Sequence, residues 1–525
     1  MTTASASQTL SDPHRTERAA RADLRSVAMG GAVTGFAVAL AMWCVWFLTH
    51  LPGLGVSSAT AGVLQLLTLA IGVLVATPAI ARTLDRCMLA GAAAGLVAGL
   101  LQLLIMGSRL TQQPEGAVNP TAIGVSGDVG VLAPSAGLIA GGFIATCLAV
   151  GVVAGLGSWG LRLAPIISTR HLDTPASRRA SLAFIAALAI APLLLLGGLV
   201  TSTESGMAVP DWPGTYGANM FLYPIGLMAH PRIFLEHTHR LFGSLAGLNA
   251  LAVLLVTLLA PASRRGEGLR SFAVLLAVLA ALGGALIAEQ SGRLATPMLL
   301  VLGGMMFIGA VVVGWIGAIS GRVKWAAAAV FALVANQGML GGVRVTANDA
   351  WLAMAHGIGG QVVFATSIAL AAAMLPASSS GRNTRAGVFG LVALGVLLIQ
   401  LAMGAAYRHL GDTHALWGHV VFSIVAVIAS VLAGVWFLKH ALTRRLGQAI
   451  VAVVGLQFVL GWGALFSVMG TEDRGPSPTY EQLAEAAPPP APPGGVATGH
   501  QANGALLLGL IAFGAMRTLR SPNAD

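Results

Sequence analysis

The chain has 525 residues, of which 56% are hydrophobic and only 9% charged, and its mean hydropathy is +0.82. This balance excludes a soluble globular protein and predicts an all-α polytopic membrane protein. The net charge of +10 would suit a nucleic-acid partner, but the placement of the basic residues, given below, attributes it to membrane orientation.

Runs of about 18–25 apolar residues predict membrane-spanning helices. The chain contains fourteen such runs, the weakest at 271–288 and 297–319. They cover residues 26–48, 58–79, 87–108, 135–161, 182–202, 239–260, 271–288, 297–319, 324–343, 351–375, 386–406, 416–438, 446–467 and 501–519.

The predicted helices divide into an N-terminal extension and two bundles. Residues 1–25 are expected to be a cytoplasmic tail, because no cleavage site follows the first apolar run. Residues 26–165 form a four-helix extension, 180–378 a first bundle with extra helices at about 271–319, and 383–525 a second bundle. Residues 470–499, rich in proline, predict a polyproline-like tether before the last helix.

The basic residues test this layout. With a cytoplasmic N-terminus, 22 of the 29 Lys and Arg residues lie in segments on the inner side. This is the bias that the positive-inside rule requires, so the basic excess sets orientation and predicts no nucleic-acid partner. Nine of the twelve histidines lie instead near the outer face, which indicates that the chemistry is carried out there.

A repeated unit links these histidines to glycines. Helices running outward end in Gln337-Gly-Met-Leu-Gly341, Gln400-Leu-Ala-Met-Gly404 and Gln457-Phe-Val-Leu-Gly461, and Leu193-Leu-Leu-Leu-Gly197 matches apart from the glutamine. After each outer loop, the next helix of the unit carries a histidine near its start: His239, His356, His419 and His500. Four copies predict two paired, pseudo-symmetric halves. Glycine would also let a flat macrocycle approach the backbone, although small residues can simply pack helices closely.

The most polar stretch at a helix start is Glu236-His-Thr-His-Arg240. Charged groups at the end of a membrane helix cost free energy and usually have a function. Glu236 and His239 share a helix face, and Arg240 lies one turn beyond Glu236. His237 and His239 are two residues apart, so their side chains point to different sides of the helix and are not expected to face one metal ion.

Four histidines in equivalent places predict metal ligands, whereas any one alone would more often be an interfacial polar residue. Zinc is disfavoured because no cysteine or carboxylate cluster accompanies them. Haem fits better, with two axial imidazoles from facing helices: His239 with His356, and His419 with His500. Arg240, Arg344 and Arg408 could pair with haem propionates, or serve as interface anchors.

Several short stretches of the chain together match the pattern of one known family: Gly197-Gly-Leu-Val-Thr-Ser, Met207-Ala-Val-Pro-Asp-Trp-Pro213, Glu236-His-Thr-His-Arg240, Gln337-Gly-Met-Leu-Gly-Gly, His356, Tyr407-Arg-His, His419 and His500-Gln-Ala-Asn-Gly-Ala. Through these stretches, residues 182–525 resemble the haem A synthase family of cytochrome oxidase assembly. The resemblance implies two four-helix haem bundles, near the outer face of the plasma membrane of a bacterium, with both chain ends cytoplasmic. The implied reaction oxidises the C8 methyl group of haem O to a formyl group, giving haem A.

The resemblance also implies roles for single residues. His239 and His356 would ligate the substrate haem O and its product haem A, and His419 and His500 a haem b that relays electrons. Glu236 matches the family's catalytic glutamate, which could take the proton released from the methyl group or stabilise a cation. The alternative is that Glu236 only pairs with Arg240.

Partners implied by the resemblance are membrane lipid, haem O synthase, oxidase assembly factors and an electron acceptor that the sequence does not specify; a homo-oligomer is compatible with it. The chain departs from some members of the family because residues 203–236 contain no cysteine. A thiol-based electron handover in that loop is therefore excluded. The helices in 26–161 carry no recognisable motif and few ionisable residues, which argues against a transport path.

Two other functions remain open from the residues alone. A non-catalytic dihaem b cytochrome that takes electrons from quinol would need the same four histidines but not Glu236. A haem carrier or exporter would bind haem loosely and provide a path across the bilayer.

Overall fold

The computed structural model describes residues 13–112, 130–166, 174–259, 321–376, 382–469, 479–482 and 492–520. In these ranges, 12 helices are long and apolar enough to cross a membrane, by length and composition. The multi-pass, all-helical prediction is thus confirmed, except that a two-stranded hairpin of four residues interrupts one loop. The predicted helices at 271–288 and 297–319 lie outside the described residues, so the count of fourteen stays a prediction.

The chain forms two compact units. The first comprises Met1–Val45, Ser57–Gln102 and Ala140–Arg178. It contains most of α1 (Pro13–Thr49), α2 (Ser58–Ala76), α3 (Leu84–Met106) and α4 (Ala136–Gly160). Its core consists mainly of small and aliphatic side chains. Gly91 and Gly95 of α3 face Gly151 and Cys147 of α4 so closely that an added Cβ would meet backbone carbonyl groups, the packing expected where small residues let membrane helices approach.

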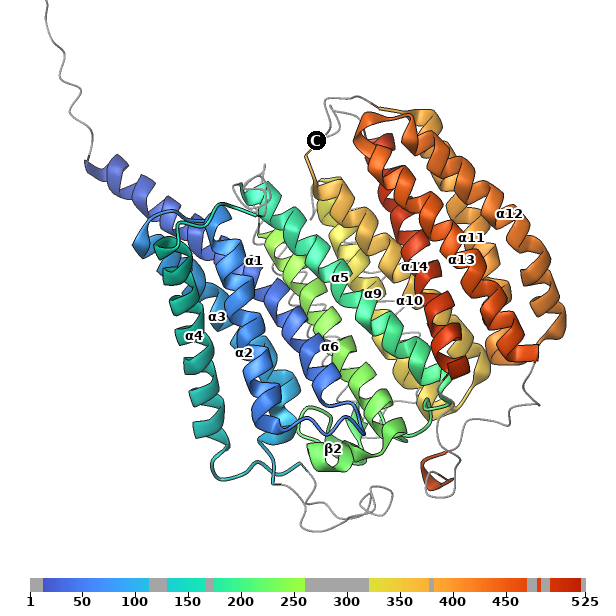
Figure 1. The fold of residues 1–525 in the computed structure, drawn as a ribbon, viewed down its shortest axis with the longest axis horizontal. Coiled ribbons are helices and arrows are strands. Elements are labelled where there is room, and N and C mark those ends of the chain that lie inside the picture. Colours follow the sequence, from blue (N-terminus) through green and yellow to red (C-terminus); the bar gives the residue numbers. More distant parts are fainter. Residues whose placement is uncertain are drawn as a thin grey trace, which may run out of the picture. The chain divides into compact units, whose positions relative to one another are not determined.

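The second unit contains two helix bundles and comprises Trp46–Val56, Leu103–Ile139 and Arg179–Asp525. Its first bundle is built from α5 (Pro175–Ser202), α6 (Pro231–Leu258), α9 (Arg322–Ala347) and α10 (Ala350–Met374). The second bundle is built from α11 (Thr384–Leu410), α12 (Thr413–Leu438), α13 (Arg444–Met469) and α14 (Pro492–Leu519). In the second bundle each helix contacts the next, and α14 returns to α11, which closes a ring of four helices (Figure 1).

The two bundles of this unit share a seam. Helix α14 packs on α10, where the ring of Phe364 lies against Gly509. It also packs on α5, where the hydroxyl groups of Ser202 and Thr498 form a hydrogen bond of 3.0 Å. The last helix of the second bundle therefore also covers the first bundle.

Residues 203–230 form a structured cap over one end of the first bundle, which we call the cap end. A hairpin of β1 (Gly214–Thr215) and β2 (Ala218–Asn219) lies at its centre. The carboxylate of Asp211 accepts hydrogen bonds from the backbone N–H of Tyr216 at 2.7 Å and of Gly217 at 2.9 Å. These bonds hold the turn in which both residues have positive φ.

Three helices begin earlier than the apolar runs predict. Helix α6 starts at Pro231, with His230 as its N-cap, so Glu236-His-Thr-His-Arg240 lies inside the helix and not at its mouth. Helix α14 starts at Pro492, inside the expected proline tether, and α1 starts at Pro13, inside the expected polar tail. Each begins with proline, which suits the first helical turn because its missing N–H would have no partner there.

Candidate functional site

Two imidazoles face each other at the cap end of the first bundle. His239 comes from α6 and His356 from α10, and their ring centroids lie 6.3 Å apart with the planes 89° to one another. Two metal–nitrogen bonds of about 2 Å, plus about 1 Å from each nitrogen to its ring centre, give about 6 Å. The spacing therefore fits one metal ion held between the two rings.

The second bundle repeats this arrangement. His419 of α12 and His500 of α14 have ring centroids 6.2 Å apart and planes at 82°. The structure thus brings together both pairs that the sequence joined. Whether they hold haem stays a prediction.

Each of the four imidazoles lies against a glycine of the neighbouring helix. A Cβ atom added at that glycine would lie 2.8–3.1 Å from the ring carbon Cε1, closer than normal contact. The four contacts are Gly197 with His239, Gly341 with His356, Gly404 with His419 and Gly461 with His500. Glycine is therefore needed at these positions to leave room for the imidazole ring. The sequence had suggested another explanation, namely that glycine lets a macrocycle approach the backbone.

The glutamines of the repeat fix the orientation of the histidines. The side-chain amide of Gln400 donates to the carbonyl of His419 at 2.9 Å, while Nδ1 of His419 donates to the carbonyl of Gln400 at 2.8 Å. That bond leaves Nε2 unprotonated, the form in which an imidazole binds a metal. The side-chain amide nitrogen of Gln337 donates to the carbonyl of His356 and also lies 2.9 Å from its Nδ1, so this amide holds the ring but does not place the proton on Nδ1 as in His419.

Glu236 is only 2% exposed, and both its carboxylate oxygens have partners. Oε1 accepts from Arg240 at 2.8 Å, and Oε2 accepts from the backbone N–H of Val209 at 2.8 Å. The predicted pairing of Glu236 with Arg240 is confirmed. The carboxylate, three residues before His239 in the chain, is thereby bonded to the cap. Its catalytic role stays a prediction.

Arg240 joins α6 to the cap. Besides Glu236, its guanidinium donates to the carbonyl groups of Val209 at 2.8 Å, Gly214 at 3.0 Å and Asp211. These bonds use the donors that a propionate would need, so the structure assigns Arg240 at least the role of a loop anchor.

The other two arginines lie between helices. Arg344 of α9 donates to the carbonyl of Gly206 at 2.8 Å, and its charge acts on both His239 and His356. Arg408 of α11 donates to Ser202 of α5 at 2.6 Å. Arg344 is thus beside the first histidine pair, as its predicted propionate role requires.

His237 turns away from the histidine pair, as expected. Its Nδ1 lies 3.0 Å from the hydroxyl of Thr215 in the hairpin, and its ring packs on Tyr223 with centroids 5.4 Å apart. Burial raises the pKa of the Tyr223 hydroxyl, and Asp211 adds to the effect, so Tyr223 stays protonated. No role for Thr215 or Tyr223 could be predicted from the sequence, because the alternation of aromatic and polar residues within a loop is too weak a signal.

Trp212 and the ends of the N-terminal helices complete the cap. The indole of Trp212 packs on Gly342 of α9, where no Cβ could fit. At Gly107, just beyond α3, an added Cβ would likewise collide, here with the backbone carbonyl of Phe221. Trp46 at the end of α1 stacks on Phe234 with centroids 6.1 Å apart. The ends of α1 and α3 that belong to the second unit therefore support the cap from outside the bundle.

In the described ranges, no three or more His, Cys, Asp and Glu side chains gather as a metal-ion cluster. The donors present are thus two imidazoles per site, a set that suits the two axial positions of a haem iron and not a tetrahedral zinc ion. No family model, curated protein or solved structure matches the chain.

Proposed function

We propose that the chain is a haem A synthase-like membrane oxidoreductase. It would hold haem O between His239 and His356 and oxidise its C8 methyl group to a formyl group. A haem b between His419 and His500 would pass the electrons on. The observation that supports this best is the facing pair of imidazoles, found twice at 6.3 and 6.2 Å.

The chain's own residues bind and orient the substrate in this proposal. Haem iron, when bound, supplies the redox chemistry. The glycine under each imidazole sets the ring position, and Arg344 offers a cation for a propionate. Each oxygen of the Glu236 carboxylate accepts one protein hydrogen bond, from Arg240 or from the N–H of Val209, and keeps a further lone pair that could accept a proton.

The surroundings of the enzyme follow from the same proposal. The chain would lie in the plasma membrane of a bacterium, with both ends cytoplasmic and the cap end outward. It would receive haem O from a haem O synthase and deliver haem A to oxidase assembly factors.

The test is co-expression with a haem O synthase, followed by extraction and chromatography of the haems. We expect haem O and haem A with the wild-type chain, and haem b without haem A in His239→Ala and His356→Ala. Extracts that contain haem b alone from the wild-type chain would contradict the synthase proposal.

A non-catalytic dihaem b cytochrome is the second candidate. It is favoured by one observation: both oxygens of Glu236 are already bonded within the protein, as in a purely structural carboxylate. Haem A in extracts of the wild-type chain separates the two functions, and Glu236→Gln then tests the role of the glutamate, because the amide keeps the size of the side chain and one acceptor. Loss of haem A with both haem sites still filled supports a catalytic Glu236, whereas unchanged haem A output assigns Glu236 to the cap alone.

A further inference from the structure

The four helices that seat the imidazoles differ at one position of their shared pattern. Helices α9, α11 and α13 carry a glutamine four residues before the glycine, namely Gln337, Gln400 and Gln457. Helix α5 carries Leu193 at this position, four residues before Gly197. A leucine side chain forms no hydrogen bonds, so the first of the four copies lacks a donor and an acceptor that the other three have.

In two copies the glutamine joins the glycine-bearing helix to the histidine itself. The side-chain amide of Gln337 donates from α9 to the backbone carbonyl of His356 on α10. The amide of Gln400 donates from α11 to the carbonyl of His419 on α12 at 2.9 Å. These bonds hold the glycine and the ring that it seats in a fixed relation.

The fourth copy has a link of the same kind, made further along the helix. Gln457 of α13 accepts a 2.7 Å hydrogen bond from the side-chain amide of Asn503, three residues after His500 on α14. Leu193 can make no such link from α5 to α6. His239 is therefore the one ligand of the four for which the glutamine link between the two helices is missing.

Helix α5 also differs from the other three in its backbone. Pro192 lies inside it, directly before Leu193, whereas α9, α11 and α13 contain no proline. Proline has no N–H group to bond to the carbonyl of Leu188, four residues earlier, and helices bend most readily at such a gap. Gly197, which seats the ring of His239, lies beyond this point.

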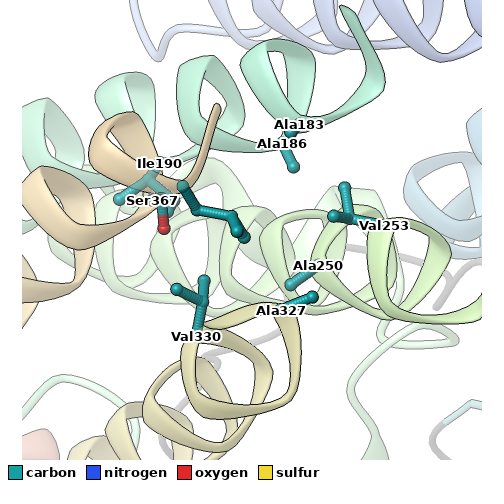
Figure 2. A pocket seen from close by; sticks show the side chains of 9 residues that line it. Ala183, Ala186, Ile190, Ala250, Val253, Ala327, Val330 and Ser367 are labelled. Atoms are coloured by element: carbon teal, nitrogen blue, oxygen red, sulfur yellow. The ribbon is translucent and has the colours of Figure 1, made fainter. Parts of the chain in front are cut away.

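The part of α5 before Pro192 is packed within the first bundle. Figure 2 shows Ala183, Ala186 and Ile190 pointing toward side chains of α6, α9 and α10. The space left between these side chains holds about one water molecule. This part of the helix therefore has little room to shift.

The part of α5 after Pro192 is attached to the second bundle. Ser202 shares a hydrogen bond of 3.0 Å with Thr498 of α14 and accepts one of 2.6 Å from Arg408 of α11. His239 belongs instead to α6, in the first bundle. A bend of α5 at the proline would therefore move the seat of the ring with the second bundle and leave the ring behind.

We propose that His239 is the axial ligand that leaves the iron when haem enters or leaves the first site, and that His356 stays bound. The inference rests on the proposed function, in which the first site exchanges haem O for haem A and the second site keeps its haem b. Leu193 and Pro192 are positioning residues that act through Gly197. The exchange is thus confined to the one copy of the repeat that lacks a glutamine and contains a proline.

Leu193→Gln supplies the missing amide and tests the proposal. The full-length protein also carries His419→Ala, so that haem O is loaded at the first site alone, and the haem is then reduced. Carbon monoxide binds a six-coordinate haem iron only after one imidazole has left, so its rate of binding, followed by absorption after rapid mixing, measures that departure. We expect this rate to fall about 2- to 10-fold, as one additional hydrogen bond predicts. Leu195→Gln, at a 45% exposed position of the same helix, is the matched control and should leave the rate unchanged.

Two further measurements identify the ligand and guard against misfolding. In the same His419→Ala background, His239→Ala should keep its haem through His356 and bind carbon monoxide faster, whereas His356→Ala should lose its haem. Pro192→Ala restores the N–H group in α5 and should also slow the binding of carbon monoxide. This variant decides the question if Leu193→Gln does not fold.

Three results would overturn the inference. The first is an unchanged rate in both Leu193→Gln and Pro192→Ala, and the second is an equal fall in Leu195→Gln. The third is a His356→Ala protein that holds haem as well as His239→Ala does. A His419→Ala protein that takes up no haem at all would refute the proposed function itself.

Discussion

The contact between a glycine and an imidazole ring occurs four times in the two bundles. A histidine side chain normally has several rotamers, and the ring becomes a useful ligand only when its neighbours hold it in one of them. Here the missing Cβ of the glycine makes room for the ring, and the glutamine one turn earlier holds the next histidine by hydrogen bonds in two of the four copies, Gln337 with His356 and Gln400 with His419.

Gly404→Ala tests this contact. The new Cβ would lie 2.9 Å from Cε1 and 3.0 Å from Nδ1 of His419, so the ring must shift. We expect the second site to lose its haem, with an overpacking cost of about 1–3 kcal/mol in unfolding free energy. Haem per protein, measured by absorption, should fall from two to one.

Gly395→Ala is the control for that change, because a Cβ on this glycine of the same helix meets nothing within 4 Å. Full haem content in both variants would show that the imidazole does not depend on the glycine.

His50 makes a pH-sensitive contact beyond the end of α1. Its Nδ1–H donates to the carbonyl of Trp46 at 2.7 Å, and its Nε2 accepts from Arg109 at 2.6 Å. Burial lowers the pKa of His50 below its ordinary 6.5, and the charge of Arg109 lowers it further, against the opposing effect of the Trp46 bond. This contact therefore exists with a neutral imidazole.

The sign of the pH effect follows from that pKa. Below about pH 6.5 the unfolded chain binds a proton at His50 that the folded chain does not, so stability is complete above this pH and declines as the pH falls. We expect the melting temperature to drop more steeply on acidification in the wild type than in His50→Gln. Parallel pH profiles of the two proteins would contradict this assignment.

At the level of elements, the cap is held by helix faces and not by its own short hairpin. Arg240 and Glu236 of α6 bind its backbone, Thr215 contacts His237, and Trp212 packs on α9. A two-stranded hairpin alone is marginally stable, so these contacts give the cap its shape over the histidine pair.

Gly342→Ala should loosen the cap. The added methyl group would collide with the Trp212 indole, and we expect a loss of about 1–3 kcal/mol in stability because packed groups must move. Chymotrypsin should then cut the cap at its aromatic residues faster than in the wild type. In Gly338→Ala, one turn earlier with open space around the site, the cutting rate should stay at the wild-type level.

The sequence predicted most elements but misplaced some boundaries. Hydropathy follows the lipid-facing residues, so it located the spans that the structure describes. It did not predict that α6 begins at Pro231, eight residues before the apolar run, because these polar residues are buried by contacts with the cap that precedes them. The histidine pairs were predictable because four copies of one pattern constrain each other. The contacts of the cap were not, because they depend on how the backbone of a loop meets the side chains of α6 and α9.

At the scale of the whole molecule, the chain combines a duplicated bundle pair with a separate helical unit. In the first unit, α3 and α4 approach through Gly91, Gly95 and Gly151. These glycines serve packing inside that unit, and the histidine pairs belong entirely to the other one. A lesion in the first unit should therefore leave the spectrum of the sites intact.

Gly151→Leu is the corresponding test. A side chain there would meet the carbonyl of Gly91, and we expect destabilisation of the first unit by at least about 1–3 kcal/mol, seen by calorimetry. Haem content should stay unchanged. Gly141→Leu, on the same helix with nothing near its Cβ, should alter neither quantity.

The seam between α5 and α14 has a consequence for biosynthesis. The ribosome makes α5 well before α14, yet Ala505 of α14 belongs to the same buried cluster as Ile190 of α5. The first bundle therefore lacks part of its wall, and the second bundle lacks His500, until α14 has been made. On the proposed function, we expect a chain cut short before residue 492 to bind haem at neither site.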